Sequence, residues 1–436
     1  MNTENLHNLL GIEECIRYYP PNIETIQDPE AILRNDREID LYLHIPFCKA
    51  PCGFCPFNQY RYQEYEVKLY LSAIEQEIMA LKTRHDLSQV RIRAIWIGGG
   101  TPSDLDEEAL EKLLSVIQEN FNLGHVKEFT IDVKPILSMI TDSKLLILHK
   151  YNVNRISVGV QSTNQACLTA LGRNYTPRIA FDAIEKIRQG NFAINIDMIY
   201  RLPGQTQSQV ADDVDHVRSL GIDHISWFPY ISHPGTPLSE KISRGEMSKT
   251  ADRKQYFEMF NTILEHMNRA GYQQYTPYYY SREKQCQYHV DRWRMPQLEI
   301  LGIGAGAFSF FNGWIYANAH SLDRYRKAVN EQKLPIVMGK KLSPAEKITR
   351  FAVLGSKFFT VNMEEFRQYS GVRMDVFYQK ELELLERSGL IEIQENHVNC
   401  TLLGKAFNND ISMYFSADSA RGKNQPQAVQ LMNEGL

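Results

Sequence analysis

Short apolar runs alternate with longer segments of helical periodicity from about residue 40 to residue 270. Leu41–Ile45 alternates like a strand, and Val67–Thr83 carries apolar side chains three or four positions apart, as an amphipathic helix does. Helical patterns also follow the other predicted strands, which are Ala94–Ile97, Phe129–Val133, Arg155–Val160, Ala193–Ile199 and His224–Tyr230. Six strand–helix units in succession predict an α/β fold with parallel strands, in a barrel or partial barrel rather than a sandwich.

The pattern changes after Tyr272. An aromatic and polar segment comes first, followed by the glycine-rich stretch Leu301–Asn312. From about Lys341, helical patterns precede two short runs, Leu390–Glu395 and His397–Leu402, which predict a β-hairpin. Helices followed by a small hairpin predict a mostly helical, winged-helix-like domain at the C-terminal end.

We therefore divide the chain into five segments. These are a lead-in at 1–38, the barrel at 39–272, a glycine and aromatic segment that completes the active site at 273–340, the winged-helix-like domain at 341–412 and a flexible tail at 413–436. The flexible tail is expected because that segment is rich in Asn, Gln, Ser and Gly.

Charge and hydropathy exclude several classes of partner. The 436 residues include 52 acidic and 48 basic side chains, for a net charge of −4, which gives no support to nucleic-acid binding. No apolar run approaches the ~20 residues that cross a bilayer, and the N-terminus lacks the basic and apolar regions of a secretory signal. We expect a cytoplasmic monomer with neither a nucleic-acid nor a membrane partner.

Three of the seven cysteines, Cys48, Cys52 and Cys55, lie within eight residues. Cysteines this close in a reducing compartment are typical of metal ligands rather than of disulfides. A structural zinc site needs four ligands, and His44 is the nearby candidate for the fourth. A [4Fe–4S] cluster also usually takes four cysteines, so three would leave one iron open for a substrate or cofactor. We favour the open cluster over zinc.

Candidate polar residues follow the predicted strands. The cysteine loop, Gly98–Gly100, Asp132, Gln161 and Asp197 all fall at or near the C-terminal ends of strands. In a parallel barrel these ends share one face, where ligands bind. The sequence therefore predicts one site that combines the cysteines with carboxylates and an amide.

Several motifs together carry a family resemblance, namely Tyr42–Cys55, Gly98–Pro102 (GGGTP), Val158–Gln161 (VGVQ), Leu171–Arg173 (LGR), Asp197–Pro203 (DMIYRLP) and His233–Pro237 (HPGTP). With them the chain resembles the radical S-adenosylmethionine (SAM) superfamily. Within it, the resemblance is to oxygen-independent coproporphyrinogen III oxidase, the haem chaperones and the class C radical SAM methyltransferases. It implies a partial (β/α)6 TIM-like barrel and a [4Fe–4S] cluster on the three cysteines. The reduced cluster would cleave SAM to a 5′-deoxyadenosyl radical.

The resemblance further implies two SAM molecules held side by side. The residues implied for the cluster-bound SAM are Tyr42, Gly99, Asp132 and Phe308, and those implied for the second SAM are Phe54, Gly100, Thr101, Gln161, Arg173, Asp197 and Ile231. Glycines let the backbone approach a ligand closely. The planar guanidinium of Arg173 suits the carboxylate of a methionyl group.

Three positions depart from the family pattern. Asp132 stands where this subgroup usually has glutamate, and Phe57 stands where the porphyrinogen-oxidising members typically have a further cysteine. His289–Trp293 (HVDRW) matches the His-Asn and Tyr-Trp pattern of the haem chaperones only in part.

These departures favour a class C enzyme that alkylates an sp² carbon of a small molecule, by methyl transfer or cyclopropanation through a SAM methylene radical. One alternative is a tetrapyrrole enzyme that decarboxylates coproporphyrinogen III or opens haem anaerobically. The other is a haem chaperone with little turnover. The expected partners are a small-molecule substrate, planar or aromatic, and an electron donor such as flavodoxin or ferredoxin.

Overall fold

A curved sheet of parallel strands forms the centre of the protein. The computed structural model describes residues 24–26, 38–84, 90–296 and 298–416. Six strands pair in chain order, each parallel to its neighbour: β2 (Glu38–Ile45), β5 (Arg91–Gly99), β6 (Glu128–Val133), β7 (Arg155–Gln161), β8 (Ala193–Tyr200) and β9 (His224–Pro229). This order confirms the predicted partial barrel.

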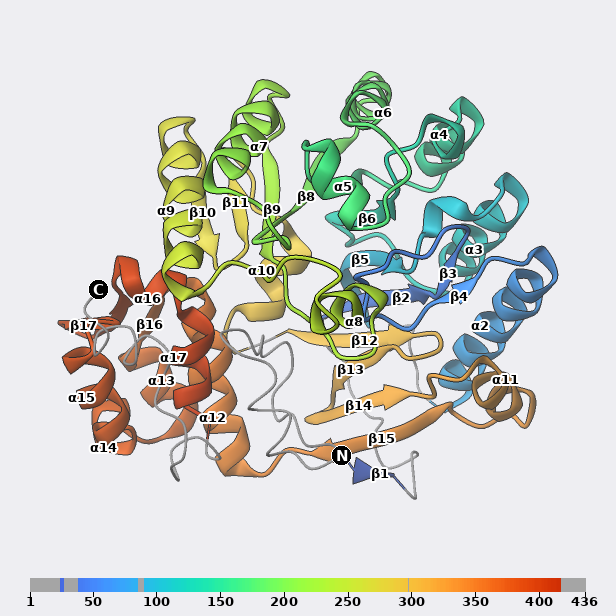
Figure 1. The fold of residues 1–436 in the computed structure, drawn as a ribbon. Coiled ribbons are helices and arrows are strands. Elements are labelled where there is room, and N and C mark those ends of the chain that lie inside the picture. Colours follow the sequence, from blue (N-terminus) through green and yellow to red (C-terminus); the bar gives the residue numbers. More distant parts are fainter. Residues whose placement is uncertain (1–23, 27–37, 85–89, 297, 417–436) are drawn as a thin grey trace.

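Helices cover the convex face of this sheet (Figure 1). In chain order the helices of the barrel are α2 (Glu64–Arg84), α3 (Glu107–Asn120), α4 (Asp142–Lys150), α5 (Gln165–Ala170), α6 (Pro177–Gln189), α7 (Gln207–Ser219), α8 (Pro237–Ser243) and α9 (Arg253–Arg269). The helix α6 buries one stripe that includes Ile184 and Ile187, whereas its other side is solvated, as its periodicity requires. The main apolar core therefore lies between the helices and the strands.

The segment after Tyr272 extends the sheet at both of its edges. Beside β9 lie the antiparallel strands β11 (Tyr279–Ser281) and β10 (Gln273–Thr276). Beside β2 lies the parallel strand β12 (Glu299–Ile303), followed by antiparallel β13 (Phe308–Phe311), β14 (Trp314–Asn318) and β15 (Ile336–Lys341). Helix α11 (Leu322–Asn330) packs on α2. The short helix α10 (Gln287–Trp293) connects the two edges and packs against β5.

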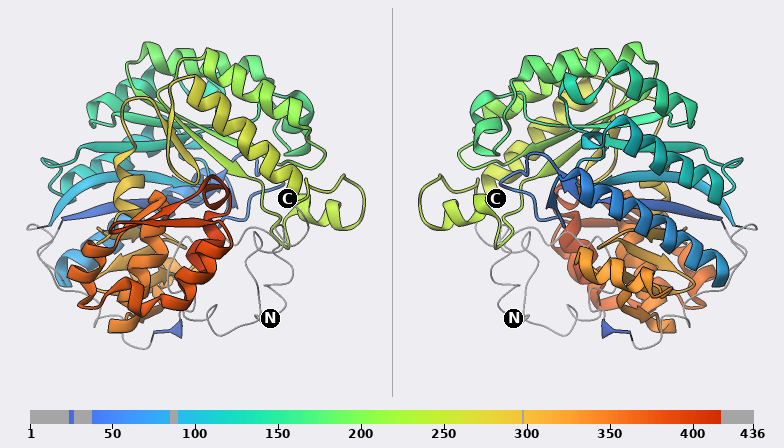
Figure 2. Two further views of the ribbon diagram at one scale, coloured as in Figure 1. Left: turned by 90° about the vertical axis from the view of Figure 1, so that its left-hand side faces the viewer. Right: turned by 90° about the vertical axis from the view of Figure 1, so that its right-hand side faces the viewer.

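The C-terminal part is mostly helical, as predicted. It consists of α12 (Pro344–Gly355), β16 (Thr360–Asn362), α13 (Met363–Ser370), α14 (Met374–Phe377), α15 (Gln379–Arg387), the hairpin β17 (Ile391–Gln394) and β18 (His397–Cys400), α16 (Leu402–Ala406) and α17 (Asn408–Tyr414). Strand β16 adds to the predicted hairpin. This part packs beside α9 (Figure 2), where Tyr256 Oη donates a hydrogen bond to Ala406 O at 2.8 Å.

Most of the predicted lead-in and tail lies outside the described residues, at 1–23, 27–37 and 417–436. The short strand β1 (Glu24–Thr25) pairs with β15. The five-part division of the chain stays a prediction. Across the described ranges, no helix combines the length and the apolar character that a membrane crossing requires.

Candidate active site

The cysteine loop follows directly after β2, at the C-terminal edge of the sheet. Cys48 ends the short strand β3 (Phe47–Cys48), whose pairing with β4 (Tyr60–Arg61) closes the loop at its base. Cys48 is buried, with Sγ 3.2 Å from Thr101 Oγ1, whereas Cys52 and Cys55 are partly exposed. Burial raises the pKa of the Cys48 thiol to about 11, so bound metal is needed to hold this sulfur as a thiolate.

The donor set of the loop fits an iron–sulfur cluster better than zinc. Within the described residues, no three His, Cys, Asp or Glu side chains are grouped closely enough to hold a single metal ion. A cluster makes a different demand, because each thiolate binds its own iron atom. His44, the candidate fourth zinc ligand, is buried and has its ring nitrogens within hydrogen-bond distance of Tyr42 Oη and Asn58 O.

The glycine turn after β5 packs directly on the cysteine loop. Gly100 N donates to Ile45 O at 2.8 Å, and Thr101 N donates to Phe47 O at 2.9 Å. A Cβ atom on Gly100 would lie 2.7 Å from Phe47 O and 2.8 Å from Ile45 O, closer than carbon atoms approach carbonyl oxygens. Glycine is therefore required at position 100 for the two loops to meet.

Two aspartates and an arginine lie partly buried beside this turn. Burial raises the pKa of the Asp132 and Asp197 carboxyls, and the charge of Asp197 raises that of Asp132 further. Asp132 Oδ1 and Arg173 Nε are buried without a hydrogen-bond partner. Such atoms are rare in folded proteins, and here they fit a charged ligand that completes their hydrogen bonding.

Gln161 ends β7 in a strained conformation. Its φ of +72° lies in the left-handed region, which residues other than glycine seldom adopt. Residues held this way cluster at functional sites. The guanidinium of Arg173 lies 5.7 Å from the centre of the Phe54 ring, so the arginine and the cysteine loop approach each other.

A cavity of about 340 Å³ joins these features. Its lining includes twelve of the fourteen predicted site residues, namely Cys48, Cys52, Phe54, Cys55, Gly99, Gly100, Thr101, Asp132, Gln161, Arg173, Asp197 and Ile231. Tyr42 and Phe308 are not part of the lining. Tyr42 Oη lies 3.0 Å from His44 Nδ1, and Phe308 begins β13, where it pairs with Ala317. Roles for these fourteen residues stay predictions.

An aromatic wall forms another side of the cavity. We use this name for Trp96, Tyr278, Tyr279, His289 and Trp293, all of which line it. The rings of Tyr279 and His289 stack with centroids 3.9 Å apart at 10°, and His289 lies 4.8 Å from Trp96. Tyr278 and Tyr279 belong to the aromatic and polar segment that follows Tyr272. His289 and Trp293 were noted only as a partial match to the haem-chaperone pattern. Their place in the wall was not predicted, because α10 has only seven residues and gives no helical period.

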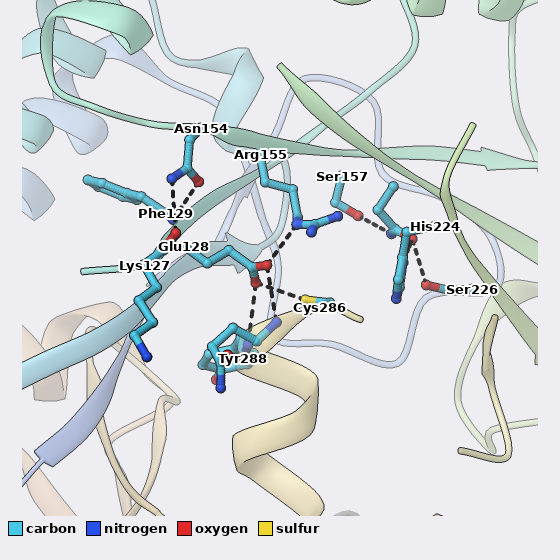
Figure 3. Close-up of polar contacts among 12 residues, drawn as sticks. Lys127, Glu128, Phe129, Asn154, Arg155, Ser157, His224, Ser226, Cys286 and Tyr288 are labelled. Carbon is cyan, nitrogen blue, oxygen red and sulfur yellow. Dashed lines mark hydrogen bonds and ion pairs between the residues drawn. The ribbon is translucent and has the colours of Figure 1, made fainter. Parts of the chain in front are cut away.

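A buried polar network holds α10 in place at the N-terminal ends of the strands (Figure 3). Glu128 of β6 accepts hydrogen bonds from Arg155 Nε at 2.9 Å and from Cys286 Sγ at 2.9 Å. It also accepts from the backbone N–H groups of Gln287 and Tyr288, at 3.1 and 3.3 Å. Because these N–H groups belong to the first two residues of α10, Glu128 holds in place the helix that supplies His289 and Trp293 to the aromatic wall.

Comparison with known proteins adds the following. Residues 42–217 match the Radical SAM superfamily, and residues 342–407 match the HemN C-terminal domain. The heme chaperone HemW of Bacillus subtilis is 29% identical over 374 residues, 85% of this chain and 97% of the chaperone. The oxygen-independent coproporphyrinogen III oxidase of Salmonella typhimurium is 27% identical over 427 residues, 92% of this chain and 91% of the enzyme. The structure of coproporphyrinogen III oxidase (HemN) from Escherichia coli matches with a TM-score of 0.79 at 26% identity, covering 89% of this chain and 92% of that one.

These relatives show that the expected alkylation of an sp² carbon, and with it the methyltransferase assignment, is wrong. The matches run over nearly the full length of proteins named for haem and coproporphyrinogen. The prediction relied on the departures from the family pattern, above all Phe57 in place of a further cysteine. A departure from the pattern of one reaction does not reveal which other molecule receives the radical, so the substrate was inferred from too little.

Proposed function

Because the chain belongs to the radical SAM superfamily, in the subgroup related to oxygen-independent coproporphyrinogen III oxidase, we propose that it is a radical SAM enzyme that acts on a tetrapyrrole. The family uses a [4Fe–4S] cluster and SAM, and bound SAM supplies a 5′-deoxyadenosyl radical there. The relatives named for haem and coproporphyrinogen support the substrate class.

One observation carries the proposal: the three cysteines and the aromatic wall line the same cavity. A radical reacts only with atoms that are held within contact distance. The stacked faces of Tyr279 and His289 suit a flat, conjugated macrocycle. The cavity therefore offers a place for a planar substrate next to the source of the radical.

Each part of the cavity has a proposed task. Cys48, Cys52 and Cys55 hold the cluster and leave one iron for SAM. Among the residues that line the cavity, Gly99 and Asp132 would contact this first SAM. The residues that would contact a second SAM are Phe54, Gly100, Thr101, Gln161, Arg173, Asp197 and Ile231. Two SAM molecules, a flavodoxin or ferredoxin as electron donor and a monomeric state belong to the proposal.

The cations of the cavity suit a substrate with carboxylates. Lys134 and Arg292 line the cavity together with the aromatic wall. The guanidinium of Arg292 lies 5.1 Å from the centre of the Trp293 ring. Arginine beside an aromatic face can pair with a carboxylate at the rim of a flat ligand, as the propionate groups of haem and coproporphyrinogen would require.

Between the two tetrapyrrole reactions, Phe57 favours anaerobic opening of haem. This half-exposed residue lines the cavity next to Cys55. The porphyrinogen-oxidising members typically have a cysteine at this position, so the chain departs from their pattern here.

The test is a turnover assay under anaerobic conditions. The reconstituted protein receives SAM, dithionite and either haem or coproporphyrinogen III. Expected is SAM-dependent loss of haem absorption together with formation of 5′-deoxyadenosine. Tyr279→Ala should weaken binding of the tetrapyrrole about tenfold and leave SAM binding unchanged, whereas Tyr369→Ala, in the exposed surface of α13, should change neither. Deoxyadenosine formed while both tetrapyrroles stay intact would contradict the proposal.

A haem chaperone is the second candidate, because the chain covers 97% of the length of the heme chaperone HemW of Bacillus subtilis. The aromatic wall would then hold haem without converting it. The two functions separate in one titration, in which haem is added first and SAM with dithionite second. A haem absorption band that persists through the second addition, without deoxyadenosine, would favour the chaperone.

A further inference from the structure

We propose that Asn195 and His224 are positioning residues that fix the Asp197 carboxylate as a hydrogen-bond acceptor for SAM. The inference rests on the proposed function in one respect, namely that Asp197 contacts a SAM molecule. It adds two residues that do not touch the cofactor and act through the carboxylate.

The strand register brings the required side chains into two neighbouring rows. Ser157 of β7 pairs with Asn195 of β8, and Asn195 pairs with His224 of β9. Asp197 follows two residues after Asn195 and so points to the same face, in register with Ser226 of β9. Ser157, Asn195, His224 and Ser226 are buried, and Asp197 lines the cavity. Figure 3 shows Ser157, His224 and Ser226 around this point.

The orientation of the Asn195 amide follows from its neighbours. Its Nδ2 lies 2.8 Å from Asp197 Oδ1 and 2.7 Å from Ser157 Oγ. A carboxylate only accepts, so the amide nitrogen faces Asp197. The amide oxygen then faces His224 Nδ1 at 2.6 Å and Ser226 Oγ at 3.1 Å, and both of these groups must donate to it.

The same reasoning assigns the proton on His224. Nδ1 carries the hydrogen that Asn195 Oδ1 accepts, and Nε2 of the neutral ring accepts from Tyr275 Oη at 2.7 Å. Burial lowers the pKa of His224 well below its ordinary value, which keeps the ring neutral, and the charge of Arg155 lowers it further. The hydrogen bonds therefore form a chain in which Tyr275 donates to His224, His224 donates to Asn195, and Asn195 donates to Asp197.

The consequence for Asp197 is a fixed orientation with acceptor sites left over. Asn195 Nδ2 donates to Oδ1, and Ser157 Oγ donates to Oδ2 at 2.9 Å. A carboxylate has about four acceptor positions, so sites remain for a ligand in the cavity. That ligand must bring donors, and the ribose hydroxyls and the ammonium group of SAM are donors.

The experiment is a calorimetric titration of the cluster-loaded protein with SAM, without reductant or tetrapyrrole. Asp197→Asn identifies the SAM equilibrium that depends on this carboxylate. Asn195→Asp keeps the side-chain size but removes both N–H donors, and it should weaken that same equilibrium at least tenfold while any other SAM equilibrium is unchanged. His224→Gln, which keeps a donor, should retain more affinity than His224→Leu. Thr130→Val changes a buried side chain of the same barrel whose hydroxyl has no partner, and it should bind SAM as the wild type does.

Thermal unfolding of each variant separates positioning from loss of fold. Wild-type affinity in a folded Asn195→Asp variant overturns the inference, and so does equal loss in the two His224 variants. If Asn195→Asp does not fold, the comparison of SAM affinity between His224→Gln and His224→Leu tests the inference instead. An Asp197→Asn variant with wild-type SAM binding also overturns it. Since no tetrapyrrole is present, all of these outcomes are independent of the substrate proposed above.

Discussion

A methyl group at position 100 would collide with two carbonyl oxygens at the start of the cysteine loop, Ile45 O at the end of β2 and Phe47 O in β3. We expect Gly100→Ala to lower stability by about 1–3 kcal/mol, because backbone atoms cannot move aside as a flexible side chain does. The thermal midpoint and the iron content after reconstitution measure the effect. Gly124→Ala, at an exposed loop position whose nearest atom is a side-chain oxygen at 3.2 Å, should stay within about 0.5 kcal/mol. Similar midpoints for both variants would contradict the role of this turn.

The cysteines give a second prediction at the scale of single residues. Cys52→Ala should abolish SAM cleavage and lower the bound iron and sulfide, because only two of the three proposed thiolate ligands are left to hold the cluster. Chemical analysis of iron and sulfide measures this. Cys167 packs with Leu171 and Ile199 in a separate group of apolar side chains. Cys167→Ala should therefore keep the iron–sulfur cluster. Full SAM cleavage by Cys52→Ala would rule out the proposed ligation.

Single residues also show where sequence reasoning succeeds and where it stops. The positions of Asp132, Gln161 and Asp197 at one face could be predicted, since parallel strands end together. Tyr42 and Phe308 were assigned through the resemblance, and the structure does not bring them into the lining. The orientation of a side chain depends on its contacts in the folded protein, such as the one between Tyr42 Oη and His44 Nδ1 within β2. The sequence pattern of a strand does not reveal such a contact.

At the scale of elements, α10 is the helix that the sequence patterns did not predict. It is short, and its N-terminus is capped by Glu128, a residue of a strand that precedes it by about 160 positions. Periodicity and local capping signals cannot reveal such a partner. The regular units are different, because their helices and strands carry a period of their own, and those were predicted closely.

The cap on α10 can be tested directly. Glu128→Gln leaves the buried guanidinium of Arg155 without its counter-ion, which typically costs about 3–5 kcal/mol. Both side chains are only 8% exposed, so solvent screens the pair little. We expect a lower thermal midpoint and weaker tetrapyrrole binding through the displaced His289. Glu111→Gln removes an exposed pair with Lys150 and should change stability by less than about 0.5 kcal/mol. Equal effects of the two changes would be inconsistent with this cap.

On the scale of the whole molecule, Glu77 joins the barrel to the segment beyond Tyr272. From α2 it accepts hydrogen bonds from Gly304 N at 2.8 Å, from Asn318 Nδ2 at 2.7 Å and from Tyr325 Oη. The sequence could not predict this joint, nor the pairing of β12 with β2, because the partners lie more than two hundred residues apart. Local patterns predict elements, whereas such distant pairs decide how the sheet is completed.

Glu77 makes stability depend on pH. Burial raises its pKa from 4.5 to about 7, so the unfolded chain releases this proton at a lower pH than the folded chain does. Stability should therefore fall as the pH rises from about 4.5 to about 7 and then level off. Between about pH 5 and pH 8 the loss amounts to about 2–3 kcal/mol. Thermal midpoints across this range should fall for the wild type and for Glu75→Gln, a partly exposed position of the same helix, but not for Glu77→Gln. The same decline in all three proteins would exclude Glu77 as the cause.

The pairing of β2 on both sides has a consequence for how the holoprotein is made. This strand hydrogen-bonds to β5 and to β12, and Ile39, Leu41 and Leu43 are fully buried. The cysteine loop thus emerges from a part of the sheet that opens only with global unfolding. We expect the metal-free chain to be a folded receptor that assembly machinery can load, unlike small domains that fold around their metal. Hydrogen exchange of the metal-free protein should accordingly be slow in β2 and fast in the loop, and rapid exchange in β2 would refute this order of maturation.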